Sequence, residues 1–162
     1  MRLRLALVPI ALAACGRGDA RPASADSAFA GVQARGEQVM GVDQYTSSHV
    51  FEDLPDGGRI VLRRDVEDTA GVAQIRTHMR DIAARFAAGD FSLPSMVHDR
   101  PVPGTGVMAA KRDVIRYVAD TLERGAQVRI VTTDTAAVRA VHEFLAFQRM
   151  DHRAAGADHG GH

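Results

Sequence analysis

The sequence has little of several residues that small folds use for stability or binding. It contains one cysteine, Cys15, and no tryptophan, and aromatic residues make up 5% of its 162 positions. A single cysteine excludes an intrachain disulfide and a zinc site built from several thiolates. The 20 basic and 20 acidic residues balance, and no basic run stands out, so we expect no nucleic-acid partner. Apolar packing alone must therefore hold the folded part together.

A long hydrophobic run is also missing, but a short one follows a basic start. Arg2 and Arg4 precede an apolar stretch over residues 5–14, which ends in the sequence LAAC at Cys15. The stretch is too short to span a bilayer as a helix, which needs about 20 apolar residues. A basic start, an apolar run and small residues are typical of an export signal, and this segment resembles the lipobox of bacterial lipoproteins. The resemblance implies lipidation of Cys15.

Lipidation would make the membrane a partner of this protein through its acyl chains, because each buried CH₂ adds about 0.8 kcal/mol. We expect a location on the periplasmic side of the cell envelope. Gly16 stands where enteric inner-membrane lipoproteins carry aspartate, which favours the outer membrane. The composition predicts four parts: a signal peptide over 1–14, a flexible tether over 15–33, one domain over 34–153 and a disordered His/Gly-rich tail over 154–162.

Two similar units are expected within the domain. Residues 50–54 and 59–64 are predicted as a hairpin, followed by a helix over 70–88, with Asp68 as its N-cap. The same order recurs in strands over 114–119 and 127–133 and a helix over 136–150 capped by Asp134. Apolar residues recur every three or four positions in both helices. The pattern predicts an α+β fold: an antiparallel sheet of four to five strands with two helices on one face. The repeated order suggests two ββα units. Residues 107–111 are the candidate fifth strand.

The connection between the units is long for so small a domain. Residues 90–106 contain three prolines and two glycines, and we expect either a functional loop or disorder there. The segment also holds Met96 and His98, which are unusual in a merely solvated linker.

Familiar catalytic motifs are incomplete or missing. His142 and Glu143 begin a run like HExxH, but Ala146 stands where the second histidine is required. The sequence contains no G-x-S-x-G, no P-loop and no G-x-G-x-x-G after a strand. Histidine and methionine remain as the residues that point to chemistry.

Imidazole binds copper, zinc and haem iron, and thioether sulfur adds a preference for Cu(I). The candidate ligands within the domain are His78, His98, His142, Met96 and His49. A weaker, flexible site is expected in the tail, from His152, His159 and His162. On a continuous helix, His142 and His152 would be about 15 Å apart, so any ordered site must combine several elements.

The domain also resembles a small family of exported bacterial proteins of unknown role. The stretches that carry the resemblance are 39–51 (VMGVDQYTSSHVF), 56–58 (DGG), 75–78 (IRTH), 89–98 (GDFSLPSMVH), 103–105 (PGT) and 141–152 (VHEFLAFQRMDH). The resemblance implies that the family's histidines are His49, His78, His98, His142 and His152. Members are sometimes labelled aspartate carbamoyltransferase, which the residues here do not support. That enzyme needs about 300 residues and a Ser-Thr-Arg-Thr loop, and this chain has neither.

Three hypotheses follow. The first is a lipid-anchored binding module for a transition metal, with copper favoured over zinc, or for haem. The second is a structural or partner-binding lipoprotein that uses the sheet face opposite the helices. The third is a small hydrolase or isomerase in which His98 acts with Asp90 or Asp99.

Overall fold

The computed structural model describes residues 25–41 and 43–154. The predicted signal peptide, Cys15, His159 and His162 lie outside the described residues. Within the described ranges, no helix is both long enough and apolar enough to cross a membrane.

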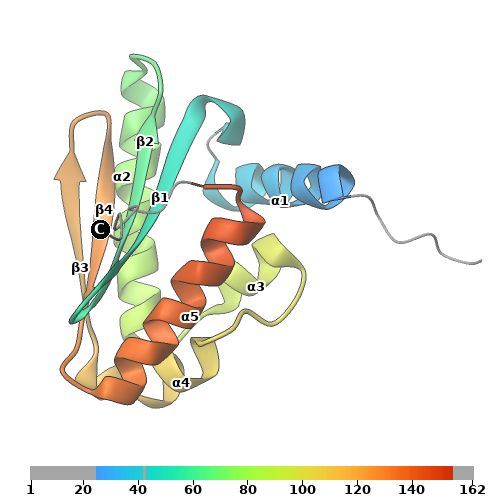
Figure 1. Ribbon diagram of the computed structural model, residues 1–162. Coiled ribbons are helices and arrows are strands. Elements are labelled where there is room, and N and C mark those ends of the chain that lie inside the picture. Colours follow the sequence, from blue (N-terminus) through green and yellow to red (C-terminus); the bar gives the residue numbers. More distant parts are fainter. Residues whose placement is uncertain (1–24, 42, 155–162) are drawn as a thin grey trace, which may run out of the picture.

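The centre of the fold is a four-stranded antiparallel sheet (Figure 1). Its strands are β1 (Ser47–Leu54), β2 (Gly57–Arg64), β3 (Arg116–Leu122) and β4 (Gly125–Val131), in the order β1-β2-β4-β3. Both predicted hairpins are present, with Leu54 opposite Gly57 and Leu122 opposite Gly125, and the strand bounds differ from the predicted ones by up to three residues. The predicted α+β class with an antiparallel sheet is therefore confirmed.

Two long helices follow the two hairpins. They are α2 (Thr69–Ala87) and α5 (Thr135–Asp151). Asp68 caps α2, since its Oδ1 accepts from the Gly71 N–H at 3.0 Å, and Asp134 caps α5 through the Ala137 N–H at 2.9 Å. Each cap satisfies a backbone donor that the helix leaves unpaired. The predicted helix limits differ from these bounds by one residue.

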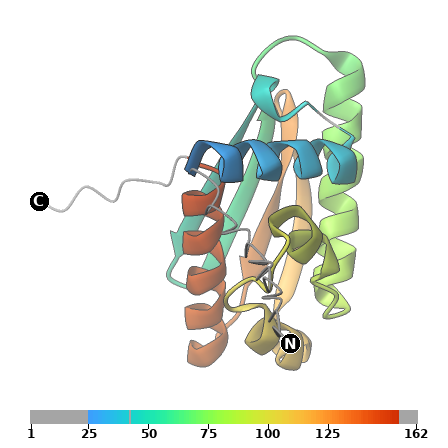
Figure 2. The ribbon, with the colours of Figure 1, turned by 90° about the vertical axis from the view of Figure 1, so that its right-hand side faces the viewer.

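The two ββα units interlock across the sheet. Helix α2 packs mainly against β3 and β4, whereas α5 packs against β1 and β2. Figure 2 shows the two helices on one side of the sheet, with a gap between them. Each helix therefore covers the hairpin of the other unit, and neither unit buries its helix alone.

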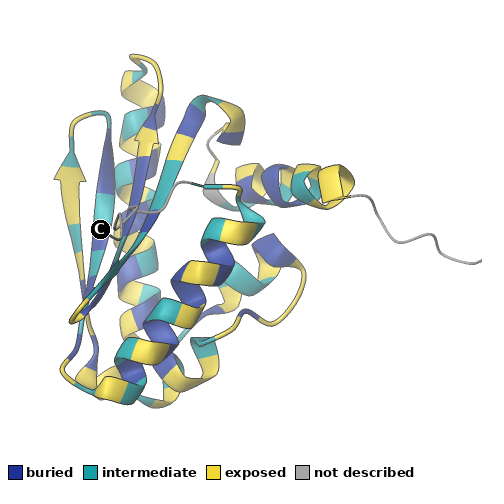
Figure 3. Ribbon diagram, in the orientation of Figure 1, coloured by how far each residue is buried: buried dark blue, intermediate teal, exposed yellow. Residues whose placement is uncertain are grey.

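Shorter elements occupy the space beside this gap. They are α1 (Ala25–Met40), η1 (Gln44–Thr46), α3 (Ser92–His98), α4 (Thr105–Ala110) and η2 (Arg112–Val114). The apolar core lies between the sheet and α2 and α5 (Figure 3). Its most deeply buried large side chains are Phe86, Phe144, Leu62, Ile75 and Met79. The rings of Phe86 and Phe144 meet edge to face at 5.8 Å between centroids.

The folded part begins earlier than the composition predicted. Residues 25–33, expected as part of the tether, form the first turns of α1. Val32 is 4% exposed, and Arg35 Nε donates to the Val97 carbonyl of α3 at 2.7 Å. Phe29, Val32 and Val39 lie on one helical stripe that needs a partner surface. Helix α1 packs against α3 and α2, and Arg153 lies over the Phe29 ring. The composition of the segment does not reveal these contacts.

Two further expectations for the central segment are wrong. Residues 90–106 are neither one long loop nor disordered, because α3 and the start of α4 lie within them. The predicted fifth strand over residues 107–111 falls largely in α4. Only Met108 is buried in that helix, whereas Val107 is 42% exposed. The short alanine-rich segment favours helix.

A glycine lets α4 approach α5 closely. Gly104 has φ +80°, and a Cβ built there would lie 2.1 Å from the Ala140 carbonyl oxygen. Both the backbone conformation and the space exclude a side chain.

We therefore expect Gly104→Ala to lower the free energy of unfolding by about 2 kcal/mol or more. Gly106→Ala is the matched control, because nothing lies within 4 Å of its Cβ position in α4. In urea denaturation the control should match the wild type or exceed it slightly. Equal losses in both variants would contradict the close packing at Gly104.

Candidate functional site

A small cavity lies between the sheet and the helices α1, α2, α3 and α5. Its volume is about 70 Å³. Most of the wall is apolar, and the larger contributors are Phe51, Ile60, Leu62, Met79, Phe86 and Phe144. The polar side chains on the wall are His49, His78, His98, His152 and Gln148. Four of the five histidines in the described ranges therefore meet at one place.

Each of these histidines comes from a different element. His49 lies on β1 and faces the same side of the sheet as Phe51, two residues later. His78 lies on α2 beside the apolar stripe, and His98 is the last residue of α3. His152 is the C-cap of α5. The crossed packing of α2 and α5 brings these four positions to one cavity.

Three of the rings are in direct contact. The centroids of His49 and His152 are 5.0 Å apart, with 22° between the ring planes. The His98 and His152 rings are also 5.0 Å apart and meet edge to face. His152 is therefore the central ring of the group.

His98 is held by hydrogen bonds on both ring nitrogens. Its side chain is 1% exposed, and Nδ1 lies 2.5 Å from Asp151 Oδ2. Nε2 lies 3.0 Å from Gln148 Oε1. Arg100 Nη2 donates to the second oxygen of Asp151 at 2.6 Å. The carboxylate therefore orients the ring so that Nε2 faces Gln148 and the cavity.

The other three imidazoles differ from His98. The ring nitrogens of His49, His78 and His152 make no hydrogen bond within the part of the chain that the structure describes. His152 Nδ1 is fully buried without a partner. Native proteins pair nearly all buried polar atoms, so an orphan of this kind requires an explanation such as a bound ion or water.

Burial also controls the charge of these rings. It lowers the pKa of His49 to about 4, with a further contribution from His78, and it lowers the pKa of His78 to about 4 despite the opposing effect of Asp81. The pKa of His152 falls to about 3, because of burial and then the neighbouring His49 and His98 rings. All three rings are neutral near pH 7. Neutral imidazole is the form that binds a metal ion.

The structure separates two of the candidate ligands from this group. Met96 is 51% exposed and does not line the cavity. His142 Nε2 lies 3.0 Å from the Leu54 carbonyl and 3.0 Å from the Gly57 carbonyl. It donates to the β1–β2 turn and so fixes α5 against that hairpin. These contacts indicate a structural role for His142.

Two cavity residues were not among the domain candidates. His152 was placed with the tail, but its position at the end of α5 directs the ring into the cavity. Met79 was assigned only to the apolar stripe of α2, and it is 1% exposed. Its position next to His78 is a sequence signal that could have suggested it. The sulfur-containing residue on the cavity wall is therefore Met79 and not Met96.

The histidine nitrogens on the cavity wall are not arranged around one common point. In the described ranges, no group of three or more His, Cys, Asp or Glu residues has the geometry of a metal site. Two imidazoles on one tetrahedral ion, with metal–nitrogen bonds of about 2 Å, have ring centres roughly 5 Å apart. The observed ring separations match this spacing, whereas the stacked orientation of His49 and His152 does not. Ring rotation would be needed to bind an ion.

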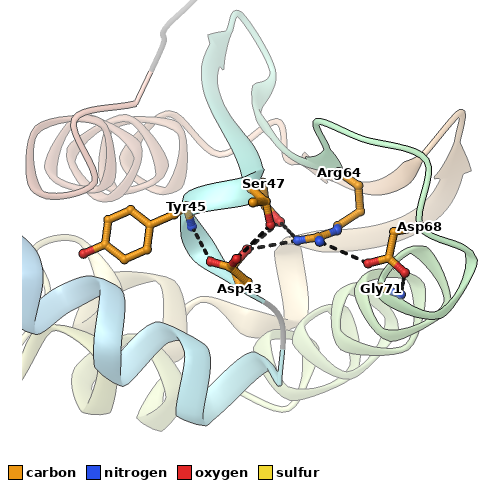
Figure 4. Close-up of polar contacts among 7 residues, drawn as sticks. Asp43, Tyr45, Ser47, Arg64, Asp68 and Gly71 are labelled. Carbon is orange, nitrogen blue, oxygen red and sulfur yellow. Dashed lines mark hydrogen bonds and ion pairs between the residues drawn. The ribbon is translucent and has the colours of Figure 1, made fainter.

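A second polar network lies where η1, the start of β1, the end of β2 and the start of α2 meet (Figure 4). Arg64 Nη1 donates to the Asp43 carbonyl at 3.1 Å and to Ser47 Oγ at 2.9 Å, and Nη2 lies 3.0 Å from Asp68 Oδ2. The network ties the start of β1 to the N-cap of α2. It thereby fixes the two elements that carry His49 and His78, and its role is structural.

No family model, curated protein or solved structure matches the chain.

The lowered pKa values predict a loss of stability in mild acid. His49, His78 and His152 are neutral in the folded state but take up protons in the unfolded state below about pH 6.5. The free energy of unfolding should therefore fall as the pH drops from 6.5 toward 4, by up to about 1.4 kcal/mol per pH unit for each histidine. Urea midpoints measured between pH 7 and pH 4.5 test this. Replacing the three histidines with glutamine should flatten the dependence, and an unchanged slope would contradict the assignment.

The contact between His98 and Asp151 makes a separate prediction. Asp151→Asn removes the charge from the hydrogen bonds with His98 and Arg100, so we expect a loss of about 1–3 kcal/mol in unfolding free energy. Asp99→Asn is the control, because Asp99 is exposed and has φ 52°, which asparagine tolerates. Urea denaturation should leave the control within about 0.5 kcal/mol of wild type. Similar losses in both variants would contradict a role for the pair.

Proposed function

We propose that this domain binds one copper ion, as Cu(I), in the histidine-lined cavity. The observation that carries the proposal is the convergence of three neutral imidazoles without hydrogen-bond partners on a single apolar cavity. In our proposal His49 and His152 are the main nitrogen ligands, and Met79 supplies sulfur.

The chemistry of the wall supports copper over other ions. A buried polar atom without a partner costs about 1–3 kcal/mol, and a bound ion would remove that cost at His152 Nδ1. Thioether sulfur selects Cu(I), whereas imidazole also accepts zinc and other ions. Met79 therefore favours Cu(I) within the range that the histidines allow.

His98 contributes in a different way. A ligand histidine typically donates its second ring N–H to a carboxylate, which fixes the ring and its tautomer. Asp151 has this relation to His98 Nδ1, and Arg100 holds Asp151 in place. Nε2 of His98 would join the ligands if Gln148 turned away.

The size of the cavity disfavours haem. Pockets that hold drug-sized molecules measure about 300–1,000 Å³. The volume here is about 70 Å³, which suits an ion with a small ligand or water. In the same proposal the domain is attached to the membrane on the periplasmic side through Cys15, where it would handle copper outside the cytoplasm.

The two alternatives have less support. A His98–carboxylate pair exists, but the carboxylate is Asp151, since Asp90 contacts Arg85 and Ser92, and Asp99 is exposed. The described cavity wall contains no serine, threonine or cysteine that could act as a nucleophile. A partner-binding role could use the outer face of the sheet. That face carries charged pairs such as Arg59 with Glu52.

Copper titration of the full chain tests the proposal. Cys15→Ser, His159→Asn and His162→Asn remove competing donors outside the described residues. We expect this background protein to bind one Cu(I) by elemental analysis, in competition with a chromogenic chelator. Adding His152→Gln to this background protein should weaken Cu(I) binding at least about tenfold, which corresponds to about 1.4 kcal/mol or more of binding free energy.

His142→Gln is the matched control, because it removes an imidazole that contacts only the hairpin carbonyls. It should keep the copper affinity even if it lowers the unfolding temperature. Absence of binding in the background protein, or equal losses in the two variants, would refute the cavity as the site.

A further inference from the structure

His78 differs from the other cavity histidines because it reaches two places at once. It lines the inner cavity, and it also lines a depression on the outside of the domain. Val39 of α1 is the other residue shared by the two hollows. His49, His98 and His152 line only the inner cavity. The boundary between the two hollows therefore runs past His78, where the end of α1 meets α2.

The rest of the depression is made by one face of α2. It includes Ala73, Gln74, Thr77 and Asp81. Gln74 Nε2 would lie 3.9 Å from a Cβ built at Gly41, which places the residue that follows α1 beside this face. The depression is thus lined by both polar and apolar side chains, and the imidazole of His78 is one of them.

Two of the other polar side chains of the depression already have partners. Asp81 Oδ2 accepts from Arg85 Nε at 2.8 Å, and Thr77 Oγ1 accepts from Arg80 at 3.1 Å. His78 makes no hydrogen bond within the described ranges, and its ring is only partly buried. Among the described residues of the depression, His78 is the one whose side chain offers copper an imidazole nitrogen without a hydrogen bond.

A copper ion arrives bound to the ligands of a carrier and loses them before it enters the cavity. Because a bare ion is strongly disfavoured in apolar surroundings, a donor of the protein must replace each ligand that is lost. A ligand at the boundary makes stepwise exchange feasible: one ligand of the carrier is replaced by imidazole, and the ion then passes to the inner donors. His78 is placed for the first exchange, and His49 and His152 for the second.

Building on the proposed function, we propose that His78 is an uptake ligand: Cu(I) binds first to His78 at the surface depression and then moves to the inner group. His78 would then control the rate of loading more than the final affinity. The inner ligands would control the affinity.

Stopped-flow transfer of Cu(I) from a chromogenic chelator tests this assignment. The protein is the full chain with the Cys15→Ser, His159→Asn and His162→Asn changes. We expect His78→Gln to slow loading at least about tenfold, within the one to three decades over which association rates vary among variants of one site. The final stoichiometry should stay at one copper per chain. His78→Met keeps a donor for Cu(I) and should restore most of the rate.

The variant Gln74→Ala is the matched control, because it alters the same depression without removing an imidazole or thioether. It should load at the wild-type rate. If the His78→Gln variant took up copper at the wild-type rate, the inference about His78 would be wrong and the proposed function would stand. A loss of stoichiometry like that of His152→Gln would also overturn the inference about His78, because His78 would then be an inner ligand. Absence of copper binding in every protein, including the background, would overturn the proposed function and this inference together.

Discussion

The hydrogen bond between His98 and Asp151 ties together the ends of two helices that line the cavity. It joins the last residue of α3 to the last residue of α5 across 53 positions of sequence. Because Arg100 pairs with the same carboxylate, the charge of Asp151 is compensated although its side chain is only 18% exposed. The bond holds α3 over the gap between α2 and α5. It also fixes the helix end from which His152 reaches the cavity.

The crossed arrangement of the two units explains why such a gap exists. Each long helix lies over the hairpin of the other unit, so the two helices lie over opposite halves of one sheet face. Large apolar side chains such as Phe86 and Phe144 fill most of the space between them. At one end of this space, imidazole rings take the place of apolar side chains. An imidazole packs like an aromatic ring but keeps polar nitrogens. The fold tolerates these rings because burial keeps them neutral.

In the proposed copper site, the stability of the fold and the binding of an ion make opposite demands. Unpaired ring nitrogens in an apolar wall reduce the stability of the fold, and the same nitrogens are available to an ion. A core optimised only for stability would contain leucine or phenylalanine at positions 49 and 152. His142 shows the contrast, since its Nε2 lies 3.0 Å from two carbonyl groups of the hairpin and does not face the cavity. The difference between these histidines lies in their surroundings, not in their residue type.

The sequence by itself determined the local structure: hairpins from turn residues and alternation, helices from caps and apolar stripes, and hence the α+β class. It also singled out His49, His78 and His98, because histidine and methionine were the reactive residues left once complete motifs were excluded. It could not separate His78 from His142, which both flank an apolar stripe, or choose Met79 over Met96. Those distinctions were decided only by the tertiary structure. Periodicity reports which residues share a face of one element, whereas the meeting of positions 49, 78, 98 and 152 depends on how α2 and α5 cross to opposite hairpins.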